Sequence, residues 1–285
     1  MEAISVAHDK GIQVALERGS THIAHQSDVL RNAHEEIGIP YSPPVPEIVE
    51  REIAEYERCD AIFVPTAFAA RTFRDRGVDA QKVHVNPYGV DLRAYGGPKP
   101  ENVKKRPRIL FVGSVGVRKG VPWLLKAHDR ISARSSIQPE LRLVGPVDGA
   151  IKDLARKWAG DNVIFTGALR GAALIEEYNR ADLFCLPSLE EGFPLSTLQA
   201  MAAGLPVITT EEAGGGEIIR DGIEGRVVPA RDVEKLADAL SELIGTRGTR
   251  EKMTEAVLAR VRSDYTIDDY IDRAIRAYRQ ILDSR

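Results

Sequence analysis

Basic residues beside closely spaced glycines are the first part of this sequence that could perform chemistry. Residues 113–120 (GSVGVRKG) follow an apolar run, precede a helical pattern, and contain Arg118 and Lys119. Glycines let a backbone approach a phosphate group, and the two basic side chains can neutralise its charge. The segment matches neither the P-loop nor the G-x-G-x-x-G dinucleotide fingerprint. A phosphate-binding turn and an ordinary turn with solvated basic residues explain it about equally well.

An acid and an amide form the second candidate site. Glu191 lies in an acidic, glycine-containing loop, and Gln199 lies eight positions later in a helical pattern. Two helical turns span roughly 11 Å, which suits two ends of one extended ligand better than a carboxylate pair at one bond. Both side chains can accept hydrogen bonds from sugar hydroxyls. On spacing alone, an acid at a helix start and an exposed helix glutamine are the simpler interpretation.

Glycine and histidine positions give weaker signals. Residues 214–216 are three consecutive glycines before Glu217, and they form either a flexible turn or a nest for an anion. His22 follows the first predicted strand, where it could orient a hydroxyl or move a proton, and a surface position is equally compatible. For His25 the surface position is favoured. Because no His or Cys pair has metal-ligand spacing, the sequence predicts no metal site.

Composition indicates a soluble globular protein. Of 285 residues, 43% are hydrophobic and 28% are charged, and the net charge of -3 gives no reason to expect nucleic acid binding. Cys59 and Cys185 lie in separate apolar runs, which favours buried free thiols in a reducing cytosol over a disulfide. No apolar run approaches the roughly 20 residues of a membrane helix. We therefore expect a cytoplasmic protein, and peripheral membrane attachment stays open.

Short apolar strands alternate with amphipathic helices after residue 107, which predicts a parallel sheet covered on both faces. The predicted strands are 108–112, 140–144, 163–166, 183–187, 206–209 and 225–228, and helices are expected at 121–133, 150–159, 172–180, 195–203, 217–220 and 233–245. Upstream, strands are expected at 12–16, 61–65 and 83–87, with helices at 27–36, 47–58 and 67–76, and helices at 250–265 and 268–282 end the chain. Ligands of such sheets bind beyond the carboxyl ends of the strands, where all the candidate loops converge.

Proline and glycine content marks a domain boundary. Residues 96–107 contain three prolines, two glycines and several lysines, so we predict a linker there. It separates a first domain, 1–95, from a second domain, 108–265.

The motifs, taken together, resemble the retaining glycosyltransferases of family 4, which have the GT-B fold. The resemblance rests on VNPYGVDL, ILFVGSVGVRKGVPWLLKAH, LRLVGPVD, NVIFTGAL, ADLFCLPSLEEGFPLSTLQAMAAGLPVITT, GGGEIIRDGIEGRVVP and YIDRAIRAYRQIL. It implies an α/β protein with a complete C-terminal Rossmann-like domain that binds a nucleotide-sugar donor without a metal ion or other cofactor. It also implies that the last helix, 266–285, packs back toward the N-terminal domain.

The resemblance also implies roles for particular residues. In this family the lysine of the first loop holds the diphosphate, here Lys119, and the first acid contacts the donor sugar, here Glu191. A histidine lies near the acceptor, and His22 is the candidate. The implied catalytic residues are thus Glu191, Lys119 and His22, and the implied donor-binding residues are Gly113, Ser114, Arg118, Lys119, Gly145, Leu169, Glu191, Gly192, Phe193, Leu195 and Gln199.

Three features depart from the family pattern. Gln199 replaces the second acid that binds ribose, so weaker donor binding is expected because charge assistance is lost. Ser114 stands where the family often has arginine, and Arg118 is a candidate substitute for that charge. The resemblance also leads us to expect that the N-terminal, acceptor-side domain is partial, through a truncated gene, a fragment, or completion by a partner chain or a second copy.

The expected activity is transfer of a sugar from a nucleotide diphosphate sugar to an acceptor hydroxyl with retention of configuration. The acceptor class, whether a glycan, a lipid-linked molecule or a small molecule, stays open, and polysaccharide biosynthesis is the expected process. Two alternatives remain: a nucleotide-sugar-binding module that performs no transfer, and a GT-B epimerase acting on a nucleotide-sugar.

Overall fold

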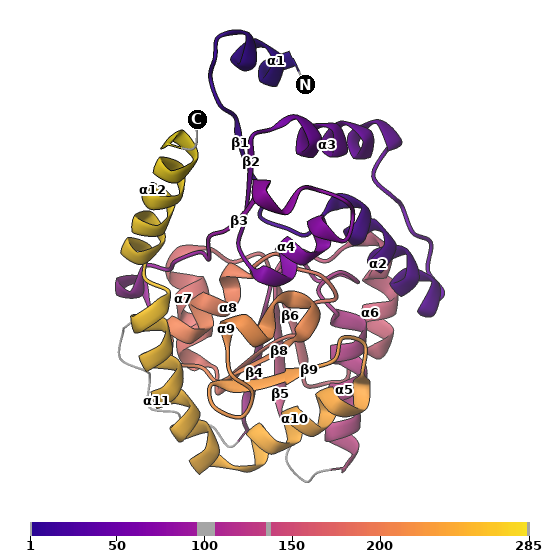
Figure 1. The fold of residues 1–285 in the computed structure, drawn as a ribbon. Helices are drawn as coiled ribbons and strands as arrows, with labels where there is room; N and C mark the ends of the chain where they lie inside the picture. The colour runs from indigo at the N-terminus through magenta and orange to yellow at the C-terminus, as the bar shows by residue number, and fades with distance from the viewer. Residues whose placement is uncertain (1, 96–105, 135–137, 284–285) are drawn as a thin grey trace. The chain divides into compact units, whose positions relative to one another are not determined.

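The computed structural model describes residues 2–95, 106–134 and 138–283, which form helices and parallel strands (Figure 1). They divide into two compact units. Unit 1 comprises Met1–Gly89, Glu190–Phe193 and Ile267–Arg285, and unit 2 comprises Val90–Leu189 and Pro194–Thr266.

Unit 2 is built on a six-stranded sheet with the order β6-β5-β4-β7-β8-β9, and every paired neighbour runs parallel. Its strands are β4 (Arg108–Val112), β5 (Glu140–Val144), β6 (Val163–Gly167), β7 (Leu183–Leu186), β8 (Val207–Thr210) and β9 (Gly225–Val228). Counted along the chain, this order is the 3-2-1-4-5-6 order of a Rossmann sheet. Strand order reverses between β4 and β7, so a ligand crevice is expected beyond their carboxyl ends.

Helices cover both faces of this sheet, because its central strands are apolar on both sides. Leu110, Leu143, Phe184 and Ile208 are all fully buried. The helices of unit 2 are α5 (Val121–Arg134), α6 (Lys152–Trp158), α7 (Gly171–Arg180), α8 (Leu195–Ala202), α9 (Gly215–Ile218), α10 (Val233–Gly245) and α11 (Arg247–Asp264). Helix α10 packs against α5, and α11 packs against α8. The helices that follow β4 to β8 each return the chain to the start of the next strand.

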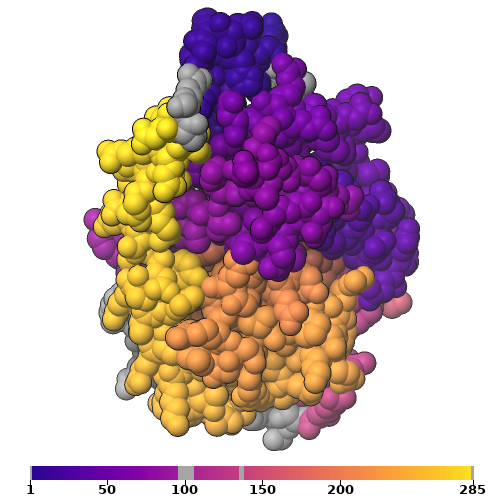
Figure 2. Space-filling model, viewed as in Figure 1, coloured from indigo at the N-terminus to yellow at the C-terminus, as the bar shows by residue number. Residues whose placement is uncertain are grey.

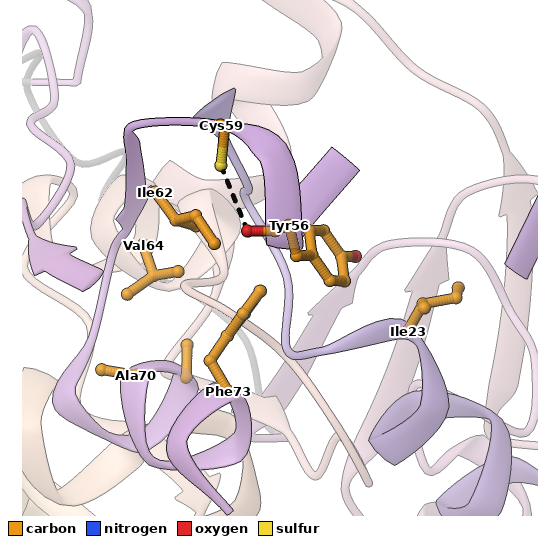
Figure 3. Packing of buried hydrophobic residues seen from close by; sticks show 8 residues of the cluster. Ile23, Tyr56, Cys59, Ile62, Val64, Ala70 and Phe73 are labelled. Carbon is orange, nitrogen blue, oxygen red and sulfur yellow. Dashed lines mark hydrogen bonds between the residues drawn. The ribbon is translucent and has the colours of Figure 1, made fainter. Parts of the chain in front are cut away.

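Unit 1 contains a three-stranded parallel sheet in the order β1-β2-β3. Its elements are α1 (Glu2–Asp9), β1 (Ala15–Glu17), α2 (Ile23–Glu36), α3 (Pro46–Arg58), β2 (Ala61–Val64), α4 (Ala67–Arg74), β3 (Val83–Val85) and α12 (Ile267–Asp283). The core joins Ile62 of β2 to Tyr56 and Phe73 from the flanking helices (Figure 3). The rings of Tyr56 and Phe73 meet edge to face, 4.9 Å apart.

The C-terminal helix α12 is part of unit 1 and lies at the surface, in yellow (Figure 2). The ring of Tyr278 packs 4.7 Å from that of Phe63, and its hydroxyl donates a hydrogen bond to Glu17. Gln13 donates to the carbonyl of Ile281. These contacts come from strands β1 and β2 and the residues just before β1. The last helix of the chain therefore packs against the first strands of unit 1.

The structure differs from the sequence-based expectations at several boundaries. Helix α2 begins at Ile23, four residues earlier than expected, because His22 caps it. Residues 90–95 lie with unit 2, since the amide of Val90 donates to the carbonyl of Tyr265 over 2.9 Å. Of the predicted linker, residues 96–105 lie outside the described residues. No sequence pattern anticipated that Glu190–Phe193 would pack with unit 1.

Candidate functional site

Two loops meet at the point where the strand order of unit 2 reverses. The amide of Leu189, after β7, donates to the carbonyl of Arg118, after β4, over 2.9 Å. Gly120 has a φ of +70°, and a Cβ there would lie 1.8 Å from the carbonyl oxygen of Pro187. Only glycine fits this approach. The basic loop is therefore held against the loop that leads to Glu191.

The side chain of Lys119 turns back over the first glycine of its own loop. A Cβ on Gly113 would lie 3.6 Å from Lys119 Cε, which is ordinary contact distance. A Cβ on Gly145 would lie 1.9 Å from the carbonyl oxygen of Gly113, so the loops after β4 and β5 also touch. Ser114 is exposed beside them. The structure thus brings Gly113, Lys119 and Gly145 together at the carboxyl edge of the sheet, where an anionic ligand would meet both the ammonium group and the backbone turn.

Two predicted donor-binding residues of unit 2 lie on neighbouring elements of the same edge. Leu169 is half-buried in the turn between β6 and α7. Leu195 begins α8 and is 49% exposed. Both follow the carboxyl ends of strands, as the βα alternation requires.

Gln199 is held by two tyrosines that the sequence patterns did not single out. The hydroxyl of Tyr178 donates to Gln199 Oε1 over 3.0 Å, and the ring of Tyr95 lies edge-on to that of Tyr178 at 5.6 Å. Burial raises the pKa of Tyr95, while a hydrogen bond with the Gln199 side chain acts in the opposite direction. Because the two tyrosines lie 83 positions apart in sequence, no motif spacing could have revealed this arrangement.

The triple-glycine turn lies at the carboxyl end of β8. Gly214 has a φ of +66°, and a Cβ on Gly215 would lie 2.4 Å from the carbonyl oxygen of Thr210. Thr210 Oγ1 donates to the carbonyl of Ser188 over 2.5 Å, which ties β8 to the loop after β7. The glycines therefore serve first to let the chain turn tightly against its own strand.

In unit 1, the segment Glu190–Phe193 contains three predicted donor-site residues. Glu191 is 6% exposed. Thr66 Oγ1 donates to the carbonyl of Gly192 over 2.9 Å, and a Cβ on Gly192 would lie 2.3 Å from the carbonyl oxygen of Gly19. The ring of Phe193 lies edge-on to that of Tyr88 at 5.8 Å. Glu191 thus extends from a backbone that unit 1 holds tightly.

His22 is buried and has structural partners. It is 3% exposed, and its Nδ1 accepts a hydrogen bond from the amide of Ala24 at the start of α2. Its ring lies 5.0 Å from that of Tyr56 and 5.3 Å from that of Phe73. Burial, with smaller contributions from Arg76 and others, lowers its pKa to about 4. These contacts favour a capping role over the predicted acceptor-side role, which stays a prediction. The neighbouring His25 is half-buried, and burial lowers its pKa as well.

The lowered pKa of His22 predicts acid sensitivity of the fold. Because the folded-state pKa is about 4 and the ordinary value is 6.5, the unfolded chain binds a proton first as pH falls. The contribution of His22 to stability is complete above pH 6.5 and declines between pH 6.5 and 4. Urea unfolding of wild type and His22→Asn between pH 6.5 and 4 measures this contribution to stability. Asparagine retains the helix cap without titrating, so the variant should show a shallower pH dependence; parallel curves would contradict the assignment.

Two other kinds of site are absent from residues 2–95, 106–134 and 138–283. No helix there is long and apolar enough to cross a membrane. No group of three or more His, Cys, Asp or Glu side chains in these ranges could hold a metal ion.

Strand order and edge loops define unit 2 as a Rossmann-like domain. Residues 106–246 match the model of the family described as glycosyl transferases group 1. Sulfoquinovosyl transferase of Arabidopsis thaliana is 32% identical over 197 residues, covering 67% of this chain and 36% of that protein. D-inositol 3-phosphate glycosyltransferase of Kribbella flavida is 32% identical over 203 residues, covering 64% of this chain and 47% of that protein. The matched regions thus span less than half the length of these two curated relatives.

Solved structures show the same fold. Sucrose-phosphate synthase from Thermosynechococcus elongatus aligns with a TM-score of 0.76 at 22% identity, covering 96% of this chain and 69% of that one. HepE of Anabaena, solved in complex with UDP and glucose, aligns with a TM-score of 0.77 at 16% identity, covering 99% of this chain and 74% of that one. The chain has an α/β fold of the GT-B type, as the sequence resemblance implied.

Proposed function

We propose that this chain is a retaining glycosyltransferase of family 4 that transfers a sugar from a nucleotide diphosphate sugar to an acceptor hydroxyl. One observation carries the proposal: Lys119 lies over Gly113, whose carbonyl closely approaches Gly145, at the strand-order reversal of a sheet whose region matches glycosyl transferases group 1. The names of the two curated relatives, a sulfoquinovosyl transferase and a D-inositol 3-phosphate glycosyltransferase, support sugar transfer as the reaction.

Lys119 would perform the main electrostatic step. Its ammonium group, with the guanidinium of Arg118 as a second cation, would stabilise charge on the departing diphosphate as the bond to the anomeric carbon breaks. The amides of Gly113 and Val115 donate to the carbonyls of Val144 and Pro146, so the amides of Ser114 and Gly116 are the ones that would contribute fixed dipoles at the same phosphate. No metal ion is needed in this arrangement, because protein cations supply the charge.

Glu191 would orient the donor sugar through its hydroxyls, and Gln199 would contact the ribose. The predicted site residues include no obvious nucleophile, which fits a reaction in which the donor phosphate takes the proton of the acceptor hydroxyl. Departure and attack then occur on the same face of the sugar, and configuration is retained. The buried free thiols of Cys59 and Cys185 support a reducing, cytoplasmic location, and polysaccharide biosynthesis is the process we propose.

Nucleotide binding and sugar transfer by the purified chain test the proposal. A nucleoside diphosphate at about 100 times its Kd should stabilise the fold by about 2.7 kcal/mol and raise Tm by several degrees. The purified chain should also remove the sugar from UDP-glucose or GDP-mannose. The nucleoside diphosphate that is released measures this reaction. Binding without any release would identify a nucleotide-sugar-binding module instead. Failure of every nucleoside diphosphate to raise Tm would refute the proposal.

Restoring the family's acid should strengthen donor binding. In Gln199→Glu, the hydroxyl of Tyr178 would donate to a carboxylate, and the ribose diol would gain a charge-assisted partner. We expect the Kd for a nucleoside diphosphate to fall about three- to tenfold, equal to about 1 kcal/mol. Isothermal titration measures it, with the 2′,3′-dideoxy nucleotide as control. An equal gain for the dideoxy nucleotide would show that position 199 does not contact the ribose.

A further inference from the structure

Glu190, the acid that precedes the predicted sugar-binding Glu191, is completely buried and has no place in the reaction as described. Its Oε1 accepts hydrogen bonds from the hydroxyls of Ser20 and Thr21, each over 2.7 Å, and from the amide of Thr21 over 3.1 Å. Its Oε2 accepts from the side-chain amide of Gln26 over 2.7 Å. Both carboxylate oxygens are therefore occupied within unit 1.

The donors to Glu190 come from one short stretch that the fold positions at the end of β1. Arg18 donates through Nε to the carbonyl of Thr21, which shapes the turn, and His22 then caps α2. Gln26 lies in the first turns of α2, and its Nε2 also reaches Ser20 Oγ at 3.2 Å. Amides at a helix start favour a nearby negative charge. The turn and the start of α2 thus present several hydrogen-bond donors to one carboxylate.

This arrangement has an energetic consequence. A buried carboxylate is costly unless its lone pairs are satisfied by hydrogen-bond donors. Glu190 satisfies this condition through side chains and one main-chain amide. Removing its charge while keeping its size takes away one of the two accepting oxygens, so at least one of these hydrogen bonds is lost or must be rearranged.

The residues after Glu190 are held as firmly. Thr66 binds the carbonyl of Gly192, and the close approach of Gly192 to Gly19 leaves no room for a side chain. Phe193 packs against Tyr88. Glu191 lies between two anchored neighbours, so its backbone has little freedom to move.

We propose that Glu190 is a positioning residue that sets the orientation of Glu191 toward the donor sugar. The proposal rests on the proposed function, because it assumes that Glu191 contacts the sugar. Glu190 itself touches neither sugar nor phosphate; it acts by locking the loop through Ser20, Thr21 and Gln26.

The amide substitution Glu190→Gln tests this role. A second variant, in which residues 26 and 190 exchange amide and carboxylate, should restore it. The substituted side chain retains one accepting oxygen. Its NH₂ group meets either the amide of Thr21 or the side chain of Gln26, which must then turn over and give up its bond to Ser20 Oγ. In the double variant Gln26→Glu/Glu190→Gln, the donor and acceptor are exchanged, so the pair can form again. Glu35→Gln, exposed at the end of α2, is the control for loss of one charge.

The readout is the affinity for UDP-glucose and for UDP, measured by titration on the full chain, with GDP-mannose and GDP as the second pair. Glu190→Gln should weaken binding of the sugar-bearing donor about tenfold and change binding of the bare diphosphate less than about twofold, a selective loss of about 1.4 kcal/mol. The double variant should recover most of this loss, and Glu35→Gln should resemble wild type. Amide hydrogen exchange at residues 191–193 should rise in Glu190→Gln and fall again in the double variant.

Three outcomes would overturn the inference while leaving the proposed function intact. Equal losses of affinity for the donor and for the bare diphosphate would show that Glu190 has a general structural role. Unchanged donor affinity would show that the hydrogen bonds of Glu190 do not position Glu191. A double variant no better than the single one would show that the Gln26 contact is not what positions the loop. If wild type binds neither diphosphate nor donor, the proposed function itself fails, and this inference fails with it.

Discussion

Lys119→Ala is expected to weaken nucleoside diphosphate binding about 100-fold, equal to about 2.7 kcal/mol. The side chain of Lys119 turns back over Gly113, where a diphosphate would meet the glycine turn. Charge-assisted hydrogen bonds to phosphate are among the strongest that a protein makes. Titration with UDP and GDP at fixed ionic strength measures the effect, since added salt would screen it.

Two companion variants show whether the charge or its position matters. Lys119→Arg keeps the charge but replaces a compact ammonium with a planar guanidinium, and should recover only part of the affinity. Arg118→Ala tests whether that side chain supplies the charge that Ser114 cannot, with a loss of about tenfold expected. Unchanged affinity in Arg118→Ala would reject that compensation. Unchanged affinity in Lys119→Ala would remove the principal support for a diphosphate at this edge.

Glu191→Gln should lower the rate of sugar transfer or donor hydrolysis about 100- to 1,000-fold, which matches the loss of one well-placed transition-state contact, about 2.7–4 kcal/mol. The carboxylate is 6% exposed and lies on the backbone anchored by Glu190 and Gly192, so its geometry should survive the substitution. Affinity for the bare diphosphate should stay within about twofold of wild type, because that ligand lacks the sugar that Glu191 is proposed to contact.

The measurement is single-turnover release of nucleoside diphosphate from the donor, with Glu176→Gln on the exposed face of α7 as the matched control. A parallel fall in diphosphate affinity would place Glu191 at the phosphate rather than at the sugar. A wild-type rate would exclude the residue from the reaction.

The predicted strands 108–112, 140–144 and 225–228 have the same bounds as β4, β5 and β9. Strands of a parallel sheet are covered on both faces, so their sequences are largely apolar runs that glycine and proline interrupt at the ends. The first strand of unit 1 was placed less well. It was expected at 12–16, but β1 spans Ala15–Glu17, where the outer residues are exposed. An edge strand buries little, so its sequence pattern is weak.

Side-chain partners were less predictable than strands. On spacing alone, the simpler interpretation was an exposed glutamine on a helix. In the structure Gln199 is half-buried and accepts a hydrogen bond from the hydroxyl of Tyr178. His22, predicted to act near the acceptor, caps a helix and packs against two aromatic rings. Both outcomes depend on residues far away in the chain, which hydrophobic periodicity does not describe.

The sequence by itself determined that a glycine-rich basic loop and an acidic loop follow strands of a parallel sheet, because βα alternation brings all such loops to one edge. Only the tertiary structure decided which unit holds Glu191. The four residues from Glu190 to Phe193 pack with Ser20, Thr21, Gln26 and Thr66, which lie more than 120 positions earlier. A buried carboxylate is stable only where its hydrogen-bond donors converge, and that convergence is a property of the folded chain.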